Sequence, residues 1–204
     1  MEAGGIDGGN LEGGDGEGVT CADLKMSILQ SLSQCAAEKG LKFLVIGGQA
    51  VIWHGYSRTT RDLDLMVPRT QQGGWRAAIE ALGYRFLHET PAFMQFEAPS
   101  PGQWPVDFTL VSDETFAKLW AEASDVSLMG ARVRMPTVMH LIALKLHAIK
   151  QGLPHREAHD LNDVIQLVDA NHIDTAAESF RQHCEKYANL KVYEAIARAT
   201  RKRD

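Results

Sequence analysis

The alternation of apolar and polar residues divides the chain into three parts. Residues 1–19 are rich in Gly and acidic residues and almost lack large apolar side chains, so we expect a disordered tail. Over residues 20–134, short apolar runs bounded by Gly or Pro alternate with amphipathic segments, which predicts an α/β part. Over residues 135–204 the apolar residues recur only at helical spacing, which predicts a helical subdomain. The fold class expected from this order is α+β, a mixed sheet with flanking helices followed by helices alone.

The individual elements follow from the same periodicity and from turn residues between them. The expected strands cover residues 41–46, 63–67, 84–88, 93–98 and 106–111, with a hairpin at 127–135. The expected helices cover residues 20–39, 49–55, 71–82, 113–123, 136–151, 157–171, 175–187 and 192–201. Asp113 is expected to cap its helix, and Pro136 to lie in the first turn of the next one.

The net charge of −5 comes from the N-terminal tail. Residues 1–18 hold five of the 26 acidic residues and no Lys or Arg, so the remainder carries 21 acids and 21 bases. A nucleic acid would therefore have to bind a local basic patch, such as the one at residues 198–203. The three cysteines lack ligand spacing, and no apolar run is long enough to span a membrane, so we expect a cytoplasmic protein with reduced thiols.

The chemistry is concentrated in residues 43–67, where an apolar strand leads into Gly47-Gly48 and then into a strand with Asp62 and Asp64. Side chains alternate along a strand, so these two carboxylates are expected on one face. Paired glycines between a strand and a helix leave backbone N–H groups open to phosphate, although such a pair is often only a turn. Two carboxylates on a solvated strand face are equally a common structural pattern.

A third acid completes the hypothesis. Asp107 lies between the apolar residues of a predicted strand, which places one carboxylate in a buried setting. Three such oxygen ligands can hold two Mg²⁺ or Mn²⁺ ions about 4 Å apart, as in two-metal phosphoryl transfer. In that scheme Asp107 also acts as the base for the attacking hydroxyl.

This set of residues resembles the DNA polymerase-beta-like nucleotidyltransferase superfamily. Its signature is an apolar residue, Gly, Gly or Ser, a spacer and then acid-apolar-acid-apolar, as in Ile46-Gly47-Gly48 and Asp62-Leu63-Asp64-Leu65. Asp107 matches the third acid. The run from Arg58 to Asp64 also resembles the Arg-x-Thr-x-Asp-x-Asp form of small bacterial members, which include AbiEii-type toxins and the minimal nucleotidyltransferases. The resemblance implies a nucleotidyltransferase fold, an NTP as co-substrate and two metal ions.

Several basic residues are candidates for binding the triphosphate. Arg58 and Arg61 can pair with phosphate oxygens or, alternatively, with Asp62 or Asp64. Lys145 lies in an apolar helix, and its position resembles that of a nucleotide-contacting lysine in the AbiEii-like group; the alternative is that it extends to solvent.

The next predicted helix places Arg156, His159, Asp160 and Asp163 on one face. This set resembles the AbiEii-type Arg-x-Lys-Asp-x-x-Asp motif, with His159 where lysine is usual. Arg156 and Asp160 are therefore candidate nucleotide-binding residues, and a structural ion-pair network is the alternative. Trp53, on the short helix after the glycines, is expected in the core.

Three functions fit this pattern. The first is an AbiEii-like toxin that transfers NMP from an NTP to a hydroxyl of tRNA or protein, with a possible antitoxin partner. The second is an aminoglycoside or lincosamide adenylyltransferase, and the third is a catalytically silent nucleotide-binding or antitoxin-like protein. The presence of all three acids favours an enzyme, whereas His159 in place of lysine keeps the silent alternative open.

Overall fold

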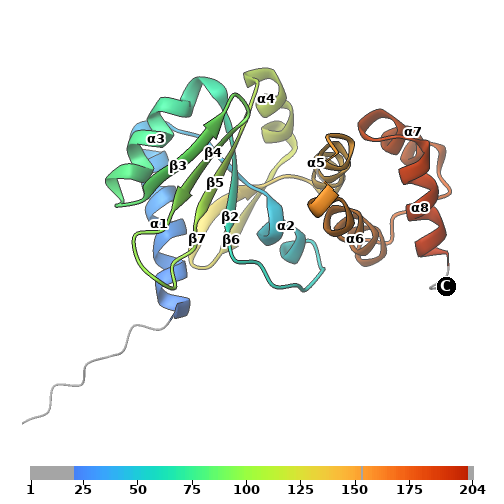
Figure 1. Ribbon diagram of the computed structural model, residues 1–204, viewed down its shortest axis with the longest axis horizontal. Coiled ribbons are helices and arrows are strands. Elements are labelled where there is room, and N and C mark those ends of the chain that lie inside the picture. Colours follow the sequence, from blue (N-terminus) through green and yellow to red (C-terminus); the bar gives the residue numbers. More distant parts are fainter. Residues whose placement is uncertain (1–20, 153, 202–204) are drawn as a thin grey trace, which may run out of the picture.

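The computed structural model describes residues 21–152 and 154–201 (Figure 1). The predicted N-terminal tail and residues 202 and 203 of the basic patch lie outside the described residues. A five-stranded mixed sheet, in the order β1-β2-β5-β4-β3, forms the first part of the molecule. Only β2 and β5 run parallel to each other; the other neighbouring strands are antiparallel. Its strands are β1 Leu44–Val45, β2 Leu63–Pro68, β3 Arg85–Thr90, β4 Phe93–Glu97 and β5 Val106–Val111.

One face of this sheet is fully covered, and the other, here called the open face, is covered only in part, where Phe116 and Leu119 pack with Met66. Along β5 buried and half-buried residues alternate, so Phe108 faces the core while Asp107 and Thr109 face the opposite side. The covered face packs against α1 (Cys21–Lys39) and α3 (Gln72–Ala81), which lie behind the sheet in Figure 1. Trp75 of α3 lies at the centre of this core, with its ring 5.5 Å from that of Phe43 and 5.6 Å from that of Phe108.

The remaining elements of the first part lie around the sheet. A short 3₁₀ helix, η1 (Arg69–Gln71), follows β2, and a two-stranded sheet consists of β6 (Ser124–Leu128) and β7 (Ala131–Met135). Helix α4 (Asp113–Glu122) is capped by Ser112, whose hydroxyl accepts a hydrogen bond from the Thr115 N–H. The prediction that Asp113 is the cap was therefore wrong by one residue: Asp113 is the first helical residue.

A group of helices follows the sheet, as predicted. They are α5 Val138–Lys150, α6 Pro154–Ala170, α7 Glu178–Tyr187 and α8 Leu190–Thr200. Helix α5 packs on α6 and α7, and α6 packs on α8. Thr137 caps α5 through a hydrogen bond from the His140 N–H, so Pro136 precedes the cap rather than lying in the first turn. No described helix is both long and apolar enough to cross a membrane.

The short helix α2 (Gly47–Trp53) joins the two parts and contacts both β2 and α5. It begins at the paired glycines themselves, two residues earlier than predicted. Its Val51 is fully buried, whereas 47% of Trp53 is exposed, so the prediction of a core tryptophan was wrong. The neighbouring His54 makes a polar contact instead, with its Nε2 2.9 Å from the Pro136 carbonyl oxygen.

The two tryptophans give a matched test of this core. We expect Trp75→Ala to reduce the free energy of unfolding by about 3–5 kcal/mol, because it leaves a cavity against Phe43 and Phe108. Trp53→Ala removes a side chain that is about half exposed and should change the free energy of unfolding by less than about 1 kcal/mol. Urea unfolding followed by circular dichroism measures both values. Equal losses in the two variants would contradict the packing described above.

Candidate active site

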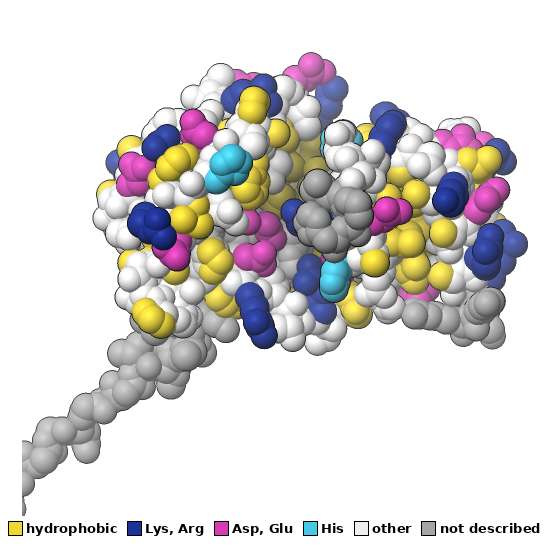
Figure 2. Space-filling model, viewed as in Figure 1, with side chains coloured by type: hydrophobic (Ala, Val, Ile, Leu, Met, Phe, Trp, Pro, Cys, Tyr) yellow, Lys and Arg dark blue, Asp and Glu magenta, His cyan; other side chains and the backbone are white. Residues whose placement is uncertain are grey.

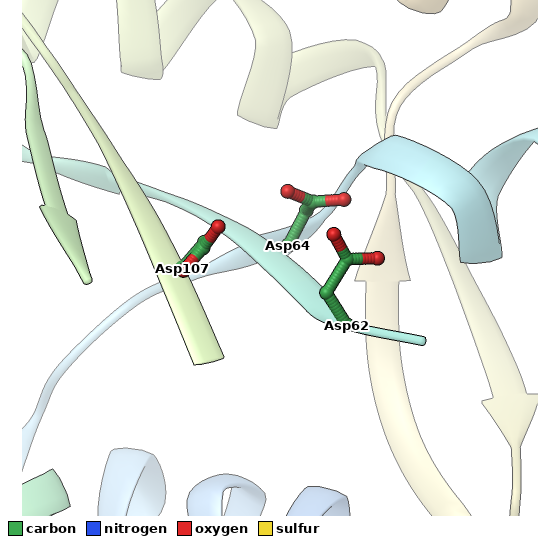
Figure 3. A group of neighbouring side chains, drawn as sticks. All are labelled: Asp62, Asp64 and Asp107. Atoms are coloured by element: carbon green, nitrogen blue, oxygen red, sulfur yellow. The ribbon is translucent and has the colours of Figure 1, made fainter. Parts of the chain in front are cut away.

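Three carboxylates meet on the open face of the sheet. Asp64 and Asp107 are register partners on the parallel strands β2 and β5, and Asp62 lies just before β2 (Figure 3). One carboxylate oxygen from each of the three lies within 4.8 Å of the others. The prediction that Asp62 and Asp64 share a face with Asp107 fits this arrangement, although Asp62 precedes the strand instead of forming part of it.

Close packing around the glycine turn fixes the positions of two of these acids. The Gly48 N–H donates a hydrogen bond to the Asp64 carboxylate. Gly47 has a φ of 59°, and a Cβ there would lie 1.8 Å from Asp64 Oδ2, so only glycine fits. A Cβ on Gly48 would lie 2.4 Å from Thr60 Oγ1, and this hydroxyl donates to Asp62 Oδ1 at 2.8 Å. The paired glycines thus bring the turn directly against the acids.

The crowding of negative charge is visible in the acid–base properties of the site. Burial, together with the charges of Asp64 and Asp62, raises the pKa of Asp107 to about 7. Burial also raises the pKa of Asp64, and the negative charge of Asp62 raises it further. The positive charges of Lys145 and Arg156 act in the opposite direction and lower it. Three carboxylates so close together are therefore unfavourable as anions without a cation between them.

The site has the composition that a divalent metal requires. All three residues offer hard oxygen ligands, which suit Mg²⁺ or Mn²⁺. Asp107 Oδ1 is buried and has no hydrogen-bond partner in the described part of the chain, and its other oxygen is 3.5 Å from Gln95 Nε2. A cation would satisfy that oxygen and relieve the repulsion between the acids, so the residues fit a metal centre.

A cleft with a volume of about 320 Å³ opens beside the acids, between the open face of the sheet and α5. Gly47, Asp64 and Arg156 line its polar part. The rest is mostly apolar, with contributions from Met66, Phe93, Val111, Leu141 and Leu144. In Figure 2 acidic side chains gather near the middle of the visible face, between the two parts of the molecule, with basic side chains close to them.

A buried ion-pair network borders this cleft, and two of its members, Lys145 and Asp160, belong to the lining. Lys145 Nζ is 2.7 Å from Asp160 Oδ1 and 2.9 Å from Asp163 Oδ2. Arg58, from the segment before β2, pairs with Asp163 at 3.1 Å. These contacts connect the segment before β2 with α5 and α6. The acids of α6 thus form the structural ion-pair network that the sequence left open as the alternative to nucleotide binding.

The predicted nucleotide-binding residues therefore lie in two groups. Lys145 and Asp160 are buried and paired with each other, and Arg58 is paired with Asp163, so these contacts give them a structural role. Arg61 and Arg156 are exposed beside the acids, and neither has a carboxylate partner within the described ranges. A role of any of these residues in binding nucleotide stays a prediction.

Sequence reasoning missed two residues that position the acids. Thr60 precedes Asp62 by two residues, and its place in the Arg-x-Thr-x-Asp-x-Asp run was the available signal. Gln95 of β4 lies opposite Asp107 in the strand register. No local pattern distinguishes it, because its importance depends on which strands pair.

A mixed sheet with three acids on its open face beside a glycine turn defines the nucleotidyltransferase fold and its site. Comparison with protein families gives the same result: the family described as "Uncharacterised nucleotidyltransferase" matches residues 22–203. The chain belongs to this family, within the polymerase-beta-like nucleotidyltransferase superfamily, and is a nucleotidyltransferase. No curated protein matches the chain.

Solved structures show the same fold at low sequence identity. An antigenic nucleotidyltransferase-like protein from Paracoccidioides brasiliensis aligns with a TM-score of 0.55 and 11% identity, covering 88% of this chain and 93% of that one. The solution structure of the antibiotic-resistance factor ANT(2″)-Ia aligns at 0.53 and 19%, covering 87% and 91%. The crystal structure of ANT(2″)-Ia with adenylyl-2″-tobramycin aligns at 0.50 and 22%, covering 87% and 97%. At these identities the similarity establishes the fold alone.

Metal binding should depend on pH through Asp107. A proton on Asp107 competes with the cation, so we expect the affinity for Mn²⁺ to increase as the pH rises through about 7 and to level off above it. Titration with Mn²⁺ followed by electron paramagnetic resonance, at pH values from about 5.5 to about 8.5, measures this dependence. Asp107→Asn should bind Mn²⁺ more weakly and lose the change near pH 7. The same pH profile in both proteins would contradict the assignment of Asp107 as a ligand.

The buried ion-pair network predicts a large loss of stability when its cation is removed. Lys145→Met leaves the carboxylates of Asp160 and Asp163 side by side in the interior, and we expect a loss of about 3–5 kcal/mol in the free energy of unfolding at pH 7. Lys118→Met, which removes an exposed pair with Glu114, is the matched control and should have little effect. Urea titrations compare the two variants. A Lys145→Met protein as stable as the control would refute a structural role.

Proposed function

We propose that this protein transfers a nucleoside monophosphate from an NTP to an acceptor hydroxyl and releases pyrophosphate. The proposal depends on one observation above all: Asp62, Asp64 and Asp107 lie together on the open sheet face, directly beside the glycine turn. Mg²⁺ or Mn²⁺ held by these carboxylates would neutralise charge on the triphosphate and activate the attacking hydroxyl.

The other residues of the site have separate roles in this proposed reaction. Asp62 and Asp64 would hold the cation, and the Thr60 hydroxyl keeps Asp62 in position. Asp107 would take the proton of the attacking hydroxyl, because it is the register partner of Asp64 on the neighbouring strand and shares its sheet face. The cleft beside α5 suits the nucleotide: its phosphates would lie near Gly47, and its base against the apolar lining.

Arg61 and Arg156 are the basic residues best placed to pair with phosphate oxygens. Both are exposed near the acids, and Arg156 lines the cleft. Guanidinium groups bind phosphate through paired hydrogen bonds, and two of them would compensate charge that the metal ions leave. Arg58 is less available for this role because it is bound to Asp163.

The acceptor is a separate question. The sequence resemblance supports an AbiEii-like toxin, with a hydroxyl of tRNA or protein as acceptor and an antitoxin as partner. The fold shared with ANT(2″)-Ia, solved with adenylyl-2″-tobramycin, keeps an antibiotic adenylyltransferase as the second candidate. Both use the chemistry proposed above, and an assay with several acceptors separates them.

The test uses the full-length protein with Mg²⁺ and each of the four α-labelled NTPs. We expect pyrophosphate release and transfer of label to an acceptor hydroxyl, and we offer bulk tRNA, total protein, an aminoglycoside panel and neutral small compounds as separate acceptor pools. Asp64→Asn should reduce transfer by more than about a hundredfold, because it removes a metal ligand. Asp125→Asn, an exposed acid on β6, is the matched control and should leave the rate unchanged.

The possible outcomes differ clearly. Label in tRNA or protein supports the toxin hypothesis, and label in an aminoglycoside supports the antibiotic adenylyltransferase. Transfer that persists in Asp64→Asn would contradict the proposed site. Tight NTP binding without pyrophosphate release from any pool would favour the catalytically silent alternative.

A further inference from the structure

A second hollow lies on the far side of the acids from the nucleotide cleft. It has a volume of about 540 Å³ and is formed by β3, β4 and the loop between β4 and β5. Residues that line it include Leu87, Gln95, Ala98, Pro99, Gln103 and Pro105. We propose that this hollow is the acceptor subsite and that it takes an uncharged, hydroxyl-bearing small molecule. This inference rests on the nucleotidyl transfer proposed above.

Gln95 connects the hollow to the reacting groups. It lines the hollow, lies opposite Asp107 in the strand register and has its Nε2 3.5 Å from Asp107 Oδ2. An acceptor in the hollow would therefore have a hydroxyl within reach of the carboxylate that removes its proton. Gln103 Oε1, which belongs to the lining of the hollow, is buried with no hydrogen-bond partner among the described residues. A hydroxyl-bearing ligand could supply the donor that this oxygen lacks.

The order of the strands gives the direction of attack. From the glycine turn outward, the open face presents Asp64 on β2, Asp107 on β5 and Gln95 on β4. In phosphoryl-group transfer the attacking and leaving oxygens lie on opposite sides of the phosphorus atom. If pyrophosphate leaves beside Gly47, the acceptor approaches from the side of Gln95, which is where the hollow lies.

The lining indicates what kind of acceptor fits. Its polar groups are mainly the carboxamides of Gln95 and Gln103, which donate and accept hydrogen bonds without a net charge. Glu97 is the charged residue of the lining, and it forms an ion pair with Arg85. A polyanion such as RNA would find no basic residue on this lining, and a polycation such as an aminoglycoside would find one carboxylate, Glu97, which is already paired. Leu87 and the prolines offer an apolar surface to the ring of an uncharged compound.

The reaction at this subsite balances as follows. The acceptor O–H bond breaks, and its proton passes to the Asp107 carboxylate. The acceptor oxygen forms a new bond to the α-phosphorus of the NTP, while the bond from that phosphorus to the bridging oxygen breaks. Pyrophosphate leaves with that bonding pair, and the product is a phosphodiester of NMP and the acceptor.

The wild-type protein is incubated with Mg²⁺, α-labelled NTP and one acceptor pool at a time. The pools are tRNA, total protein, and small cellular compounds that have been separated by charge into neutral, cationic and anionic fractions. We expect label in the neutral pool. The labelled compound is then purified for kinetics with Ala98→Trp, which fills the hollow, and with Ala117→Trp, the same change on the exposed face of α4. Ala98→Trp should raise the acceptor KM by about tenfold or more while the Kd of a fluorescent ATP analogue stays within about twofold.

A milder variant covers the case in which Ala98→Trp does not fold. Gln103→Leu keeps the size of the side chain and should also raise the acceptor KM without changing nucleotide affinity. Label mainly in tRNA, in protein or in a charged pool would overturn the proposed acceptor class. A KM in Ala98→Trp or Gln103→Leu equal to that of Ala117→Trp would overturn the subsite. Absence of pyrophosphate release with every pool is a different result, because it refutes the proposed function itself.

Discussion

The repulsion among three carboxylates is the constraint on which the rest of this structure depends. Their oxygens lie within 4.8 Å of one another on a partly buried sheet face, where charges interact more strongly than in water. The pKa values of Asp64 and Asp107 are raised first by burial and then by the charges of the neighbouring acids. Such an arrangement persists only if the surrounding fold is rigid enough to hold it, and if cations compensate it when the protein acts.

The fold provides this rigidity through two sets of contacts. The first is the glycine turn, which fits against Asp64 and Thr60 so closely that a single added carbon atom would collide with them. The second is the network of Lys145, Arg58 and the α6 acids, which connects the segment before β2 to α5 and α6. Both sets converge on the short segment that ends in Asp62, so the position of the metal ligands depends on the helical part as well as on the sheet.

Local sequence pattern predicted most elements well, because each depends on residues close together in the chain, and the three acids named from the sequence do lie together. Asp107 was recognisable as one acid between apolar neighbours, and its alternation in β5 is as expected. For Lys145 the sequence offered contact with nucleotide or extension to solvent, and it missed the buried ion pair, because the partner Asp160 lies on another helix, 15 residues further on. Trp53 was misplaced because nothing in α2 itself shows that this side of the helix stays uncovered, and Gln95 was missed because strand pairing alone brings it to Asp107.

The two sides of the acid cluster differ in charge, and this difference follows from the topology. The cleft beside the glycine turn has Arg156 and Lys145 on its lining, which suits a highly charged triphosphate. In the hollow beside Gln95, the charged residue of the lining is paired and the polar groups are mainly amides. The positive charge on the cleft would then attract the anionic NTP to one side of the metal centre, whereas the hollow on the other side would not attract it. This difference acts before any specific contact is made. The parallel pairing of β2 with β5 places the acids at the boundary between these two environments, where the transferred phosphorus must lie.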